Sequence, residues 1–343
     1  MAKIHLHRGQ RRPLLAIIGG ESLLGREVRD LAESADLGVE VQLVASGQEG
    51  DTNIIAAGAE EPLVMSTLAA ADLQSAKAVM LAGSVDSSRT AMSGIKDLNP
   101  PPAVIDLSGA LEDTPGARLR APMVDSAGPA EAVGTQVIAH PAAIALAVFL
   151  THLSKAGAIR RSMAEIFEPV SERGQAGIDE LQKQTVALLS FKQLPKEVFD
   201  TQVSFSMLPE YGSDSPHSLA AVEQKIERHL ASLLAGSTNL PMPSLRLIHA
   251  PVFHGYSISA WVEFEEIPSI DAVFDSLVSN QIDVRKGSQE PPSNVGIAGQ
   301  GGIAVGGIRP DRNQSRAVWF WIAADNLRIV AENAVEVARE LIA

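Results

Sequence analysis

The stretch LLAIIGGESLLGREVRDL, residues 14–31, decides the fold of this chain. A short apolar run from Leu14 to Ile18 ends in a glycine turn, and a helical pattern of apolar residues then continues through Leu31. Strand, glycine turn and helix in this order open the mononucleotide-binding half of a doubly wound parallel sheet. The free backbone N–H groups at the start of such a helix favour a pyrophosphate. The stretch therefore predicts a Rossmann-like α/β domain.

The glycine turn leaves two interpretations open. Gly19, Gly20 and Gly25 are placed where a backbone can approach a dinucleotide closely. Ser22 stands where a further glycine usually permits that approach, and Glu21 puts a negative charge beside the anion. We interpret the turn either as a cofactor-binding loop formed by Gly19, Gly20, Ser22 and Gly25, or as a turn that only joins strand and helix.

The second predicted strand, Val39 to Ser46, leads into the loop that selects the cofactor. A 2′-phosphate needs an arginine or a similar cation there, whereas a ribose 2′-hydroxyl needs an acidic acceptor. Residues 47–51, GQEGD, supply no cation, and this disfavours NADP. Glu49 is either the ribose acceptor of an NAD site or a charge in a solvated loop.

The rest of the chain shows two patterns. Up to residue 135, strands such as 78–82 and 103–107 alternate with helical segments such as 87–98, which predicts a parallel sheet. From Ile159 onward the pattern predicts a mixed α+β part with one sheet face available for another subunit. Its predicted strands are 160–171, 199–207, 245–252, 257–264 and 317–322, of which 245–252 and 257–264 form a pair. Its predicted helices are one capped by Ser171 and running through Leu189, and then 219–234, 270–278 and 326–342.

Composition narrows the classes of function. The 343 residues, 45% hydrophobic and 20% charged, suit a globular protein of two domains. A formal net charge of −13 argues against a nucleic-acid partner. No apolar run reaches the ~18 residues of a membrane span, and no signal-peptide pattern follows the start, so we expect a cytoplasmic protein without membrane contact. The histidines are not grouped as ligands and cysteine is absent, so no metal site is predicted.

The corner VIAHPAAIALAVFL, residues 137–150, is where a two-domain α/β enzyme would hold a nucleophile. Pro141 ends the preceding strand and allows a helix to begin. Ala142 and Ala143 then lie on the first turn, whose free N–H groups would stabilise a thiolate or an oxyanion. Because an alanine side chain attacks nothing, no covalent catalysis is expected here.

Seven segments, in order along nearly the whole chain, resemble those of the aspartate-semialdehyde dehydrogenase family. They are GGESLLGRE at 19–27, AVIDLSGALEDTPGARLRAPMVD at 103–125, VIAHPAA at 137–143, EPVSERGQAGIDEL at 168–181, FSMLPEYG at 205–212, APVFHGYS at 250–257 and AADNLRIVAENAV at 323–335. The resemblance implies a dinucleotide-binding-type domain, residues 1–140 completed by the C-terminal helix 324–343, and an α+β substrate and dimerisation domain, residues 141–323. It further implies a homodimer that uses NAD or NADP.

The resemblance also implies which positions carried the chemistry. Family members use a cysteine that forms a thioester, a glutamine beside it and a histidine as acid and base; these positions fall on Ala143, Glu168 and Tyr256. The arginine that holds the substrate carboxylate falls on His249, and the arginine used for phosphate is displaced by Glu112. The implied cofactor-binding positions are Gly19, Gly20, Ser22, Gly25, Ser46 and Asn326.

Two functional hypotheses follow from these losses. Covalent catalysis needs a nucleophile, a base and a cation for an anionic substrate, and the implied site lacks all three. The first hypothesis is a pseudoenzyme that acts by binding a metabolite, a nucleotide or a partner protein; bulky Ile329-Val330 beside the nicotinamide edge argues against the dinucleotide. The alternative is an NAD(P)-dependent oxidoreductase of non-covalent chemistry, with Tyr256 or Glu168 as proton donor.

Overall fold

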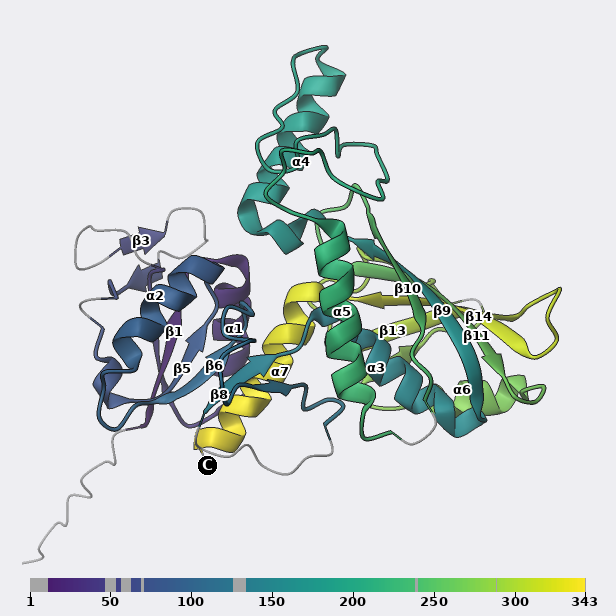
Figure 1. Cartoon of the computed structure of the whole chain (residues 1–343), viewed down its shortest axis with the longest axis horizontal. Coiled ribbons are helices and arrows are strands. Elements are labelled where there is room, and N and C mark those ends of the chain that lie inside the picture. The colour runs from purple at the N-terminus through teal and green to yellow at the C-terminus, as the bar shows by residue number, and fades with distance from the viewer. Residues whose placement is uncertain are drawn as a thin grey trace, which may run out of the picture.

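The computed structural model describes residues 12–46, 54–56, 63–68, 71–125, 134–237, 240–287 and 289–342. These residues form two six-stranded sheets and a separate short pair of strands. The first sheet contains the purple and blue strands of Figure 1, and the second contains the teal, green and yellow ones. The C-terminal helix α7, Asn326–Ile342, returns from the second sheet and packs against the first.

The first sheet is parallel throughout, in the order β2-β1-β5-β6-β8-β7. Its strands are β1 Leu14–Ile18, β2 Glu40–Val44, β5 Ala76–Leu81, β6 Ala103–Asp106, β7 Arg118–Arg120 and β8 Thr135–Ile138. One face packs against α1 (Leu23–Ser34) and α7, and the other against α2 (Val85–Ile95). Helices on both faces of a parallel sheet define a doubly wound fold, so the predicted Rossmann-like class is confirmed. The short antiparallel pair β3 (Ile54–Ala56) and β4 (Leu63–Met65) adjoins β2.

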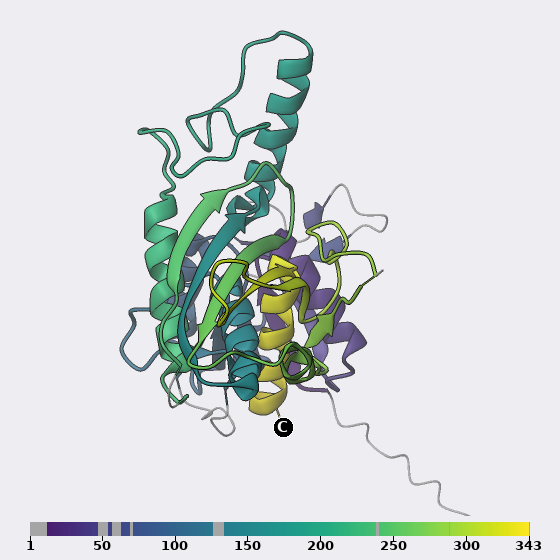
Figure 2. The same ribbon diagram turned by 90° about the vertical axis from the view of Figure 1, so that its right-hand side faces the viewer.

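The second sheet is mixed, in the order β10-β9-β11-β14-β13-β12. Its strands are β9 Ile159–Glu168, β10 Ser244–His249, β11 Tyr256–Phe264, β12 Ile282–Val284, β13 Ile303–Pro310 and β14 Ala317–Ala324. The remaining helices are α3 Pro141–Leu153, α4 Gly174–Leu189, α5 Leu219–Leu234 and α6 Ile270–Leu277, with short 3-10 turns at η1 Leu73–Ser75, η2 Ser154–Ala156 and η3 Val170–Arg173. The α+β character predicted for this part is confirmed. Figure 2 shows α4 and the loop after it projecting from the body of the molecule.

Helix α3 joins the two sheets into one core. All of its residues except Thr151 and His152 are buried, and it contacts α5, α6, α7 and β14. A helix that is apolar all round belongs in a protein interior. At its start the ring of His140 accepts a hydrogen bond of 3.3 Å from the backbone N–H of Ala142, and Pro141 occupies the first turn. The predicted change from strand to helix at Pro141 is confirmed.

The strand predicted at 199–207 is wrong, because this segment is a loop. Asp200 and Phe205 have φ of 52° and 59°, which interrupts an extended backbone. Its backbone groups bond to the buried side chain of Gln184 in α4 instead of to a neighbouring strand. The apolar alternation does not report a sheet face, because Phe199 and Val203 are buried while Phe205 and Met207 are exposed.

Two further predictions fail at the end of β9. Strands β10 and β11 do not pair, because β9 lies between them, parallel to one and antiparallel to the other. Their connection crosses the end of β9, where the carbonyls of Val252 and Phe253 accept hydrogen bonds from the backbone N–H groups of Val170 and Ser171. Ser171 does not cap α4 either, since its side chain bonds to Asn326.

Within the described ranges, no helix has the length and apolar content needed to span a membrane.

Candidate ligand-binding cleft

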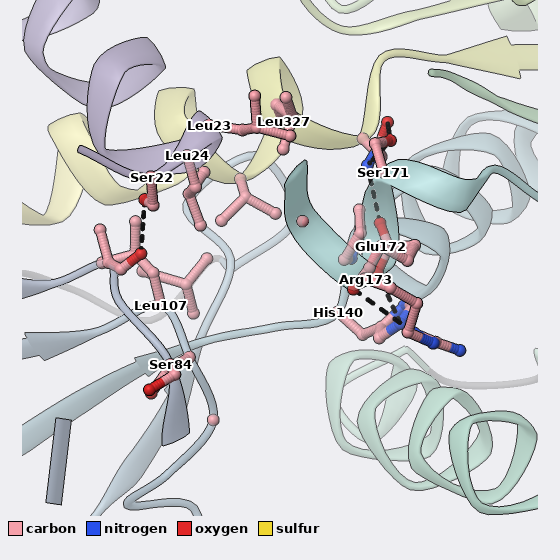
Figure 3. Close-up of a pocket in the computed structure, with 18 of the residues that line it drawn as sticks. Ser22, Leu23, Leu24, Ser84, Leu107, His140, Ser171, Glu172, Arg173 and Leu327 are labelled. Atoms are coloured by element: carbon pink, nitrogen blue, oxygen red, sulfur yellow. Dashed lines mark hydrogen bonds and ion pairs between the residues drawn. The ribbon is translucent and has the colours of Figure 1, made fainter. Parts of the chain in front are cut away.

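A cavity of about 490 Å³ lies between the carboxyl ends of the first sheet and the end of β9. Its first wall comes from the turn before α1 and the turn between β5 and α2. Its second wall comes from the corner before α3, from η3 and from the first turn of α7. Figure 3 shows the two walls, with Ser22 and Ser84 facing Glu172 and His140 across the cavity. Ligands of doubly wound sheets bind at this edge.

The glycine turn on the first wall is shaped by close packing. Gly19 has a φ of +86°, and a Cβ added there would lie 2.4 Å from the backbone nitrogen of Gly83. A Cβ on Gly25 would lie 2.2 Å from the carbonyl oxygen of Gly19. Ser22 accepts a hydrogen bond of 2.8 Å from the N–H of Gly25 and donates one of 2.8 Å to the carbonyl of Ala82. These contacts explain Gly19, Ser22 and Gly25 without a ligand.

The same wall nevertheless offers groups that suit a pyrophosphate. Helices α1 and α2 both begin at the cavity, at Leu23 and Val85. N–H groups in the first turn of a helix have no partner within it, and the helix dipole favours an anion there. The residues on this wall therefore fit the phosphates of a dinucleotide.

The predicted cofactor position Ser46 is already bonded within the protein. The Glu21 carboxylate accepts hydrogen bonds from both the backbone nitrogen, at 3.0 Å, and the hydroxyl of Ser46. A carboxylate thus lies at the end of β2, where an acidic group favours a ribose hydroxyl and opposes a 2′-phosphate. Glu49 and the rest of 47–51 lie outside the described residues.

Ala143 is enclosed by the core. It lies on the first turn of α3 with no exposed surface, and the residues of this corner that line the cavity are Ile138 to Pro141. The position implied for a nucleophile therefore holds a packed methyl group.

Glu168 lies at the centre of a buried polar cluster behind η3. Its carboxylate accepts hydrogen bonds of 2.9 Å from Arg173 and 3.0 Å from the Tyr211 hydroxyl, which lies 3.4 Å from the Nδ1 atom of His249. Burial raises the pKa of Glu168, although Arg173 and Tyr211 oppose that shift. Arg173 therefore compensates the negative charge of Glu168. Arg173 and Tyr211 were not predicted.

Tyr256 and His249 are fully buried in this cluster. Neither has exposed surface, and neither the Tyr256 hydroxyl nor the His249 Nε2 atom has a hydrogen-bond partner in the described part of the chain. Burial raises the pKa of Tyr256 far above its usual value and lowers the pKa of His249 to about 4. Both side chains are therefore neutral near neutral pH.

Glu172 is the titratable carboxyl group of the second wall. Its Oε1 atom accepts a 2.8 Å hydrogen bond from Asn326, and its Oε2 atom lies 3.8 Å from the Nε2 atom of His140. Its side chain is 15% exposed. Burial, together with the nearby charge of Glu168, raises the pKa of Glu172 to about 7. Sequence reasoning missed this residue, although the adjacent charges of Glu172 and Arg173 in a turn were visible in the sequence.

Asn326 fixes the second wall. Besides Glu172, its side chain bonds to the hydroxyl of Ser171 and accepts a 3.0 Å hydrogen bond from the N–H of Gly255. It thereby links α7 to η3 and to the start of β11. The predicted cofactor position Asn326 lines the cavity. Ile329 and Val330 are the bulky residues predicted beside the nicotinamide edge. Of the two, only Val330 lines the cavity, and Ile329 has no exposed surface.

Glu112 joins the two parts of the chain at the margin of the cleft. It contacts three cationic or imidazole groups of α5: Lys225 at 3.3 Å, Arg228 at 3.3 Å and His229 at 3.0 Å. Burial opposes ionisation, but these neighbours outweigh it and lower the pKa of Glu112. The Nδ1 atom of His229 also accepts a 2.9 Å hydrogen bond from the N–H of His140. Glu112 therefore holds α5 against the first sheet.

The structure gathers some predicted positions and separates others. Glu168, His249 and Tyr256 share one cluster behind the second wall, while the glycine turn lies across the cavity from it. Ser46 and Glu112 bond to other protein groups. Among the residues that the structure describes, no group of three or more histidine, aspartate or glutamate side chains could hold a metal ion.

Comparison with known proteins places these features in a family. Residues 150–329 match the family of the semialdehyde dehydrogenase dimerisation domain. An aspartate-semialdehyde dehydrogenase of Rickettsia bellii is 31% identical over 214 residues, which are 60% of this chain and 62% of that protein's length. A USG-1 protein homolog of Pseudomonas aeruginosa is 28% identical over 337 residues, covering 96% of this chain and 97% of the relative.

Solved structures share the fold over nearly the whole chain. A probable aspartate-semialdehyde dehydrogenase from Pseudomonas aeruginosa superposes with a TM-score of 0.81 at 26% identity, covering 96% of this chain and 98% of that one. The aspartate-semialdehyde dehydrogenase of Candida albicans, solved with NADP, has a TM-score of 0.66 at 16% identity, covering 97% and 98%. The second likeness concerns the fold alone.

Proposed function

This chain belongs to the semialdehyde dehydrogenase family, and we propose that it has lost the phosphorylating reaction and acts by binding a dinucleotide in its cleft. The observation that carries the proposal is Ala143, a methyl group packed in the core at the position implied for the thioester-forming cysteine. Without sulfur no acyl group can be held covalently there. The full sequence contains no cysteine that could replace it.

The two other implied catalytic positions support the same conclusion. Glu168 is engaged by Arg173 and Tyr211, so it does not replace the amide of a glutamine. Tyr256 is buried and neutral, so at neutral pH it does not act as a base. The helix starts on the first wall, by contrast, retain the groups that suit a pyrophosphate.

An activity assay with a matched variant tests this proposal. Purified protein with aspartate semialdehyde, phosphate and either NAD or NADP is expected to form no reduced dinucleotide above the rate without protein. Ala143→Cys is also expected to be inactive, because Glu168 and Tyr256 still occupy the positions implied for the glutamine and the histidine. Mass spectrometry of the intact protein detects any acyl adduct, and Ala142→Cys, on the same buried turn, is the control for effects of the substitution on folding.

Calorimetric titration of the unmodified protein with NADH and NADPH tests the binding part. Binding of NADH in preference to NADPH is expected, because Glu21 lies at the end of β2. Turnover of the semialdehyde at an ordinary enzymatic rate would contradict the proposal. So would a protein that binds neither NADH nor NADPH.

Glu172 favours one second candidate, an oxidoreductase without a covalent intermediate. A carboxyl group with a pKa of about 7 at the cavity suits proton transfer to a carbonyl during reduction. In this candidate the proton donor is Glu172, which lines the cavity, and not Tyr256 or Glu168, which the sequence predicts. NADH-dependent reduction of aldehydes without phosphate, lost in Glu172→Gln, would support it.

We propose that the protein is a homodimer formed through the outer face of the second sheet. Met163, Trp261 and Trp319 lie side by side on adjacent strands and therefore on one face. The indole N–H groups of Trp261 and Trp319 both donate to Asp311, at 2.9 and 2.8 Å, and this fixes the two rings. An ordered row of large apolar side chains is the composition typical of a protein interface.

A further inference from the structure

His140 and Glu172 lie close together on the second wall without forming a hydrogen bond to each other. The Nε2 atom of His140 lies 3.8 Å from the Oε2 atom of Glu172, which is too long for a hydrogen bond. Both residues line the cavity, and Figure 3 shows their side chains together on its second wall. Over the described part of the chain, Oε2 of Glu172 has no hydrogen-bond donor within bonding distance. Both atoms therefore keep hydrogen-bonding capacity for a ligand that lies beside them in the cavity.

The donor and acceptor roles of the pair are set by their other contacts. The Nδ1 atom of His140 accepts from the N–H of Ala142, so the neutral ring carries its proton on Nε2. Burial and the charges of Lys225 and Arg173 keep the ring neutral by lowering its pKa. Asn326 occupies Oε1 of Glu172 and leaves Oε2 as an acceptor. One N–H donor and one carboxylate acceptor thus lie next to each other.

We infer that His140 and Glu172 bind the primary carboxamide of a nicotinamide ring. The amide oxygen accepts a hydrogen bond from Nε2 of His140, and the amide NH₂ donates one to Oε2 of Glu172. A primary amide carries its acceptor oxygen and its donor nitrogen on the same carbon, side by side, which matches this pair. The inference rests on the proposed function, because it requires a dinucleotide in the cleft.

The position of the pair agrees with this ligand. A dinucleotide whose pyrophosphate lies at the start of α1 extends across the carboxyl ends of the strands. His140 follows the end of β8 on the far side of the same cavity. The charges agree as well, because Arg173 is paired with Glu168 and Lys225 with Glu112. Among the described residues that line the cavity, no lysine or arginine is therefore left unpaired for a carboxylate or a phosphate.

The test compares two reduced dinucleotides that differ in one group. The probes are NADH and the reduced 3-acetylpyridine analogue, in which a methyl group replaces the amide nitrogen, and binding to the full-length protein is measured by calorimetry. At pH 8, where Glu172 is ionised, NADH is expected to bind roughly tenfold more tightly, since a hydrogen bond to a charged acceptor is lost with the analogue. In Glu172→Met the two affinities are expected to be equal.

Two variants separate the roles of the pair. His140→Asn keeps a side chain that caps α3 but lacks the distant N–H, so both dinucleotides are expected to bind more weakly by the same factor, with their ratio unchanged. Glu227→Ala, which removes an exposed carboxylate from α5, is expected to change neither affinity. Thermal unfolding of each variant establishes that it is folded.

The outcomes distinguish the inference from the proposed function. Equal binding of NADH and the analogue by the unmodified protein overturns the inference and leaves the proposed function standing. A preference for NADH that persists in Glu172→Met also overturns it. Absence of binding by both probes removes the proposed function and the inference together.

Discussion

Glu172 shows how the surroundings of one side chain change its protonation. It lies on a turn between β9 and α4, where burial and the charge of Glu168 oppose its ionisation. The raised pKa means that the folded state binds a proton more tightly than the unfolded chain does. Folding is therefore weakened as pH rises from the unfolded pKa of this group, near 4.5, to about 7.

The stability of Glu172→Gln should accordingly depend on pH in a defined direction. The variant is neutral at all pH values, and its amide oxygen can keep the contact with Asn326. At pH 4, below the unfolded pKa, its free energy of unfolding should nearly equal that of the unmodified protein, and at pH 8 it should be higher by up to about 3 kcal/mol, the upper bound from a shift between 4.5 and about 7.

Urea unfolding at the two pH values measures this effect. A variant that is less stable than the unmodified protein at pH 8 would contradict the assignment. The groups that face Glu172 are Glu168, Arg173, His140, Asn326, Lys225 and the neutral Tyr256, and of these only Glu168 adds negative charge.

At the scale of elements, helix α4 holds the loop at 195–204 in place through the side chain of Gln184. The amide of Gln184, which has no exposed surface, donates to the carbonyls of Pro195 and Thr201 at 2.8 and 2.9 Å. Its oxygen accepts from the N–H groups of Val203 and Ser204 at 2.8 and 3.2 Å. One side chain thus takes the place of a strand partner for this segment.

Gln184→Met should therefore destabilise the protein. The substitution keeps the length of the side chain but leaves several buried backbone groups without partners, so a loss of roughly 2 to 4 kcal/mol is expected. Gln182→Met, on the exposed side of the same helix, is the matched control and should change stability by less than about 0.5 kcal/mol. Equal effects of the two variants in urea unfolding would refute the role given to Gln184.

At the scale of the whole molecule, the second sheet has two unequal faces. The inner face packs on α3 and α6, while the outer face carries the row of Met163, Trp261 and Trp319. Met163 is 48% exposed in the single chain. Covering this row with a second copy would remove apolar surface from water and stabilise both chains.

Met163→Arg should convert the protein from a dimer to a monomer. A charge at the centre of a buried interface has no partner and disfavours association. Val278→Arg is the control, because that residue is also exposed, at 64%, but follows α6 on the opposite side of the sheet. Light scattering after size-exclusion chromatography gives the mass, and a dimeric Met163→Arg protein would disprove the proposed interface.

The first sheet and the corner before α3 could be predicted because their signals are local. Alternation of strands with helices, the glycine turn and Pro141 each determine a conformation through neighbouring residues. The strand predicted at 199–207 is wrong because the backbone of this loop bonds to Gln184 of α4, a contact between distant residues that its apolar alternation does not reveal. The order of β10, β9 and β11 was likewise beyond reach, since pairing depends on a connection held by η3.

The sequence by itself determined the doubly wound fold, the family and the absence of a thiol at position 143. These depend on residue identity and on short-range order along the chain. Only the tertiary structure decided that Arg173 neutralises Glu168, that Glu21 holds Ser46 and that Glu172 lies opposite His140. Each of these is a contact or an electrostatic effect between groups brought together by folding, and its strength depends on distance and burial.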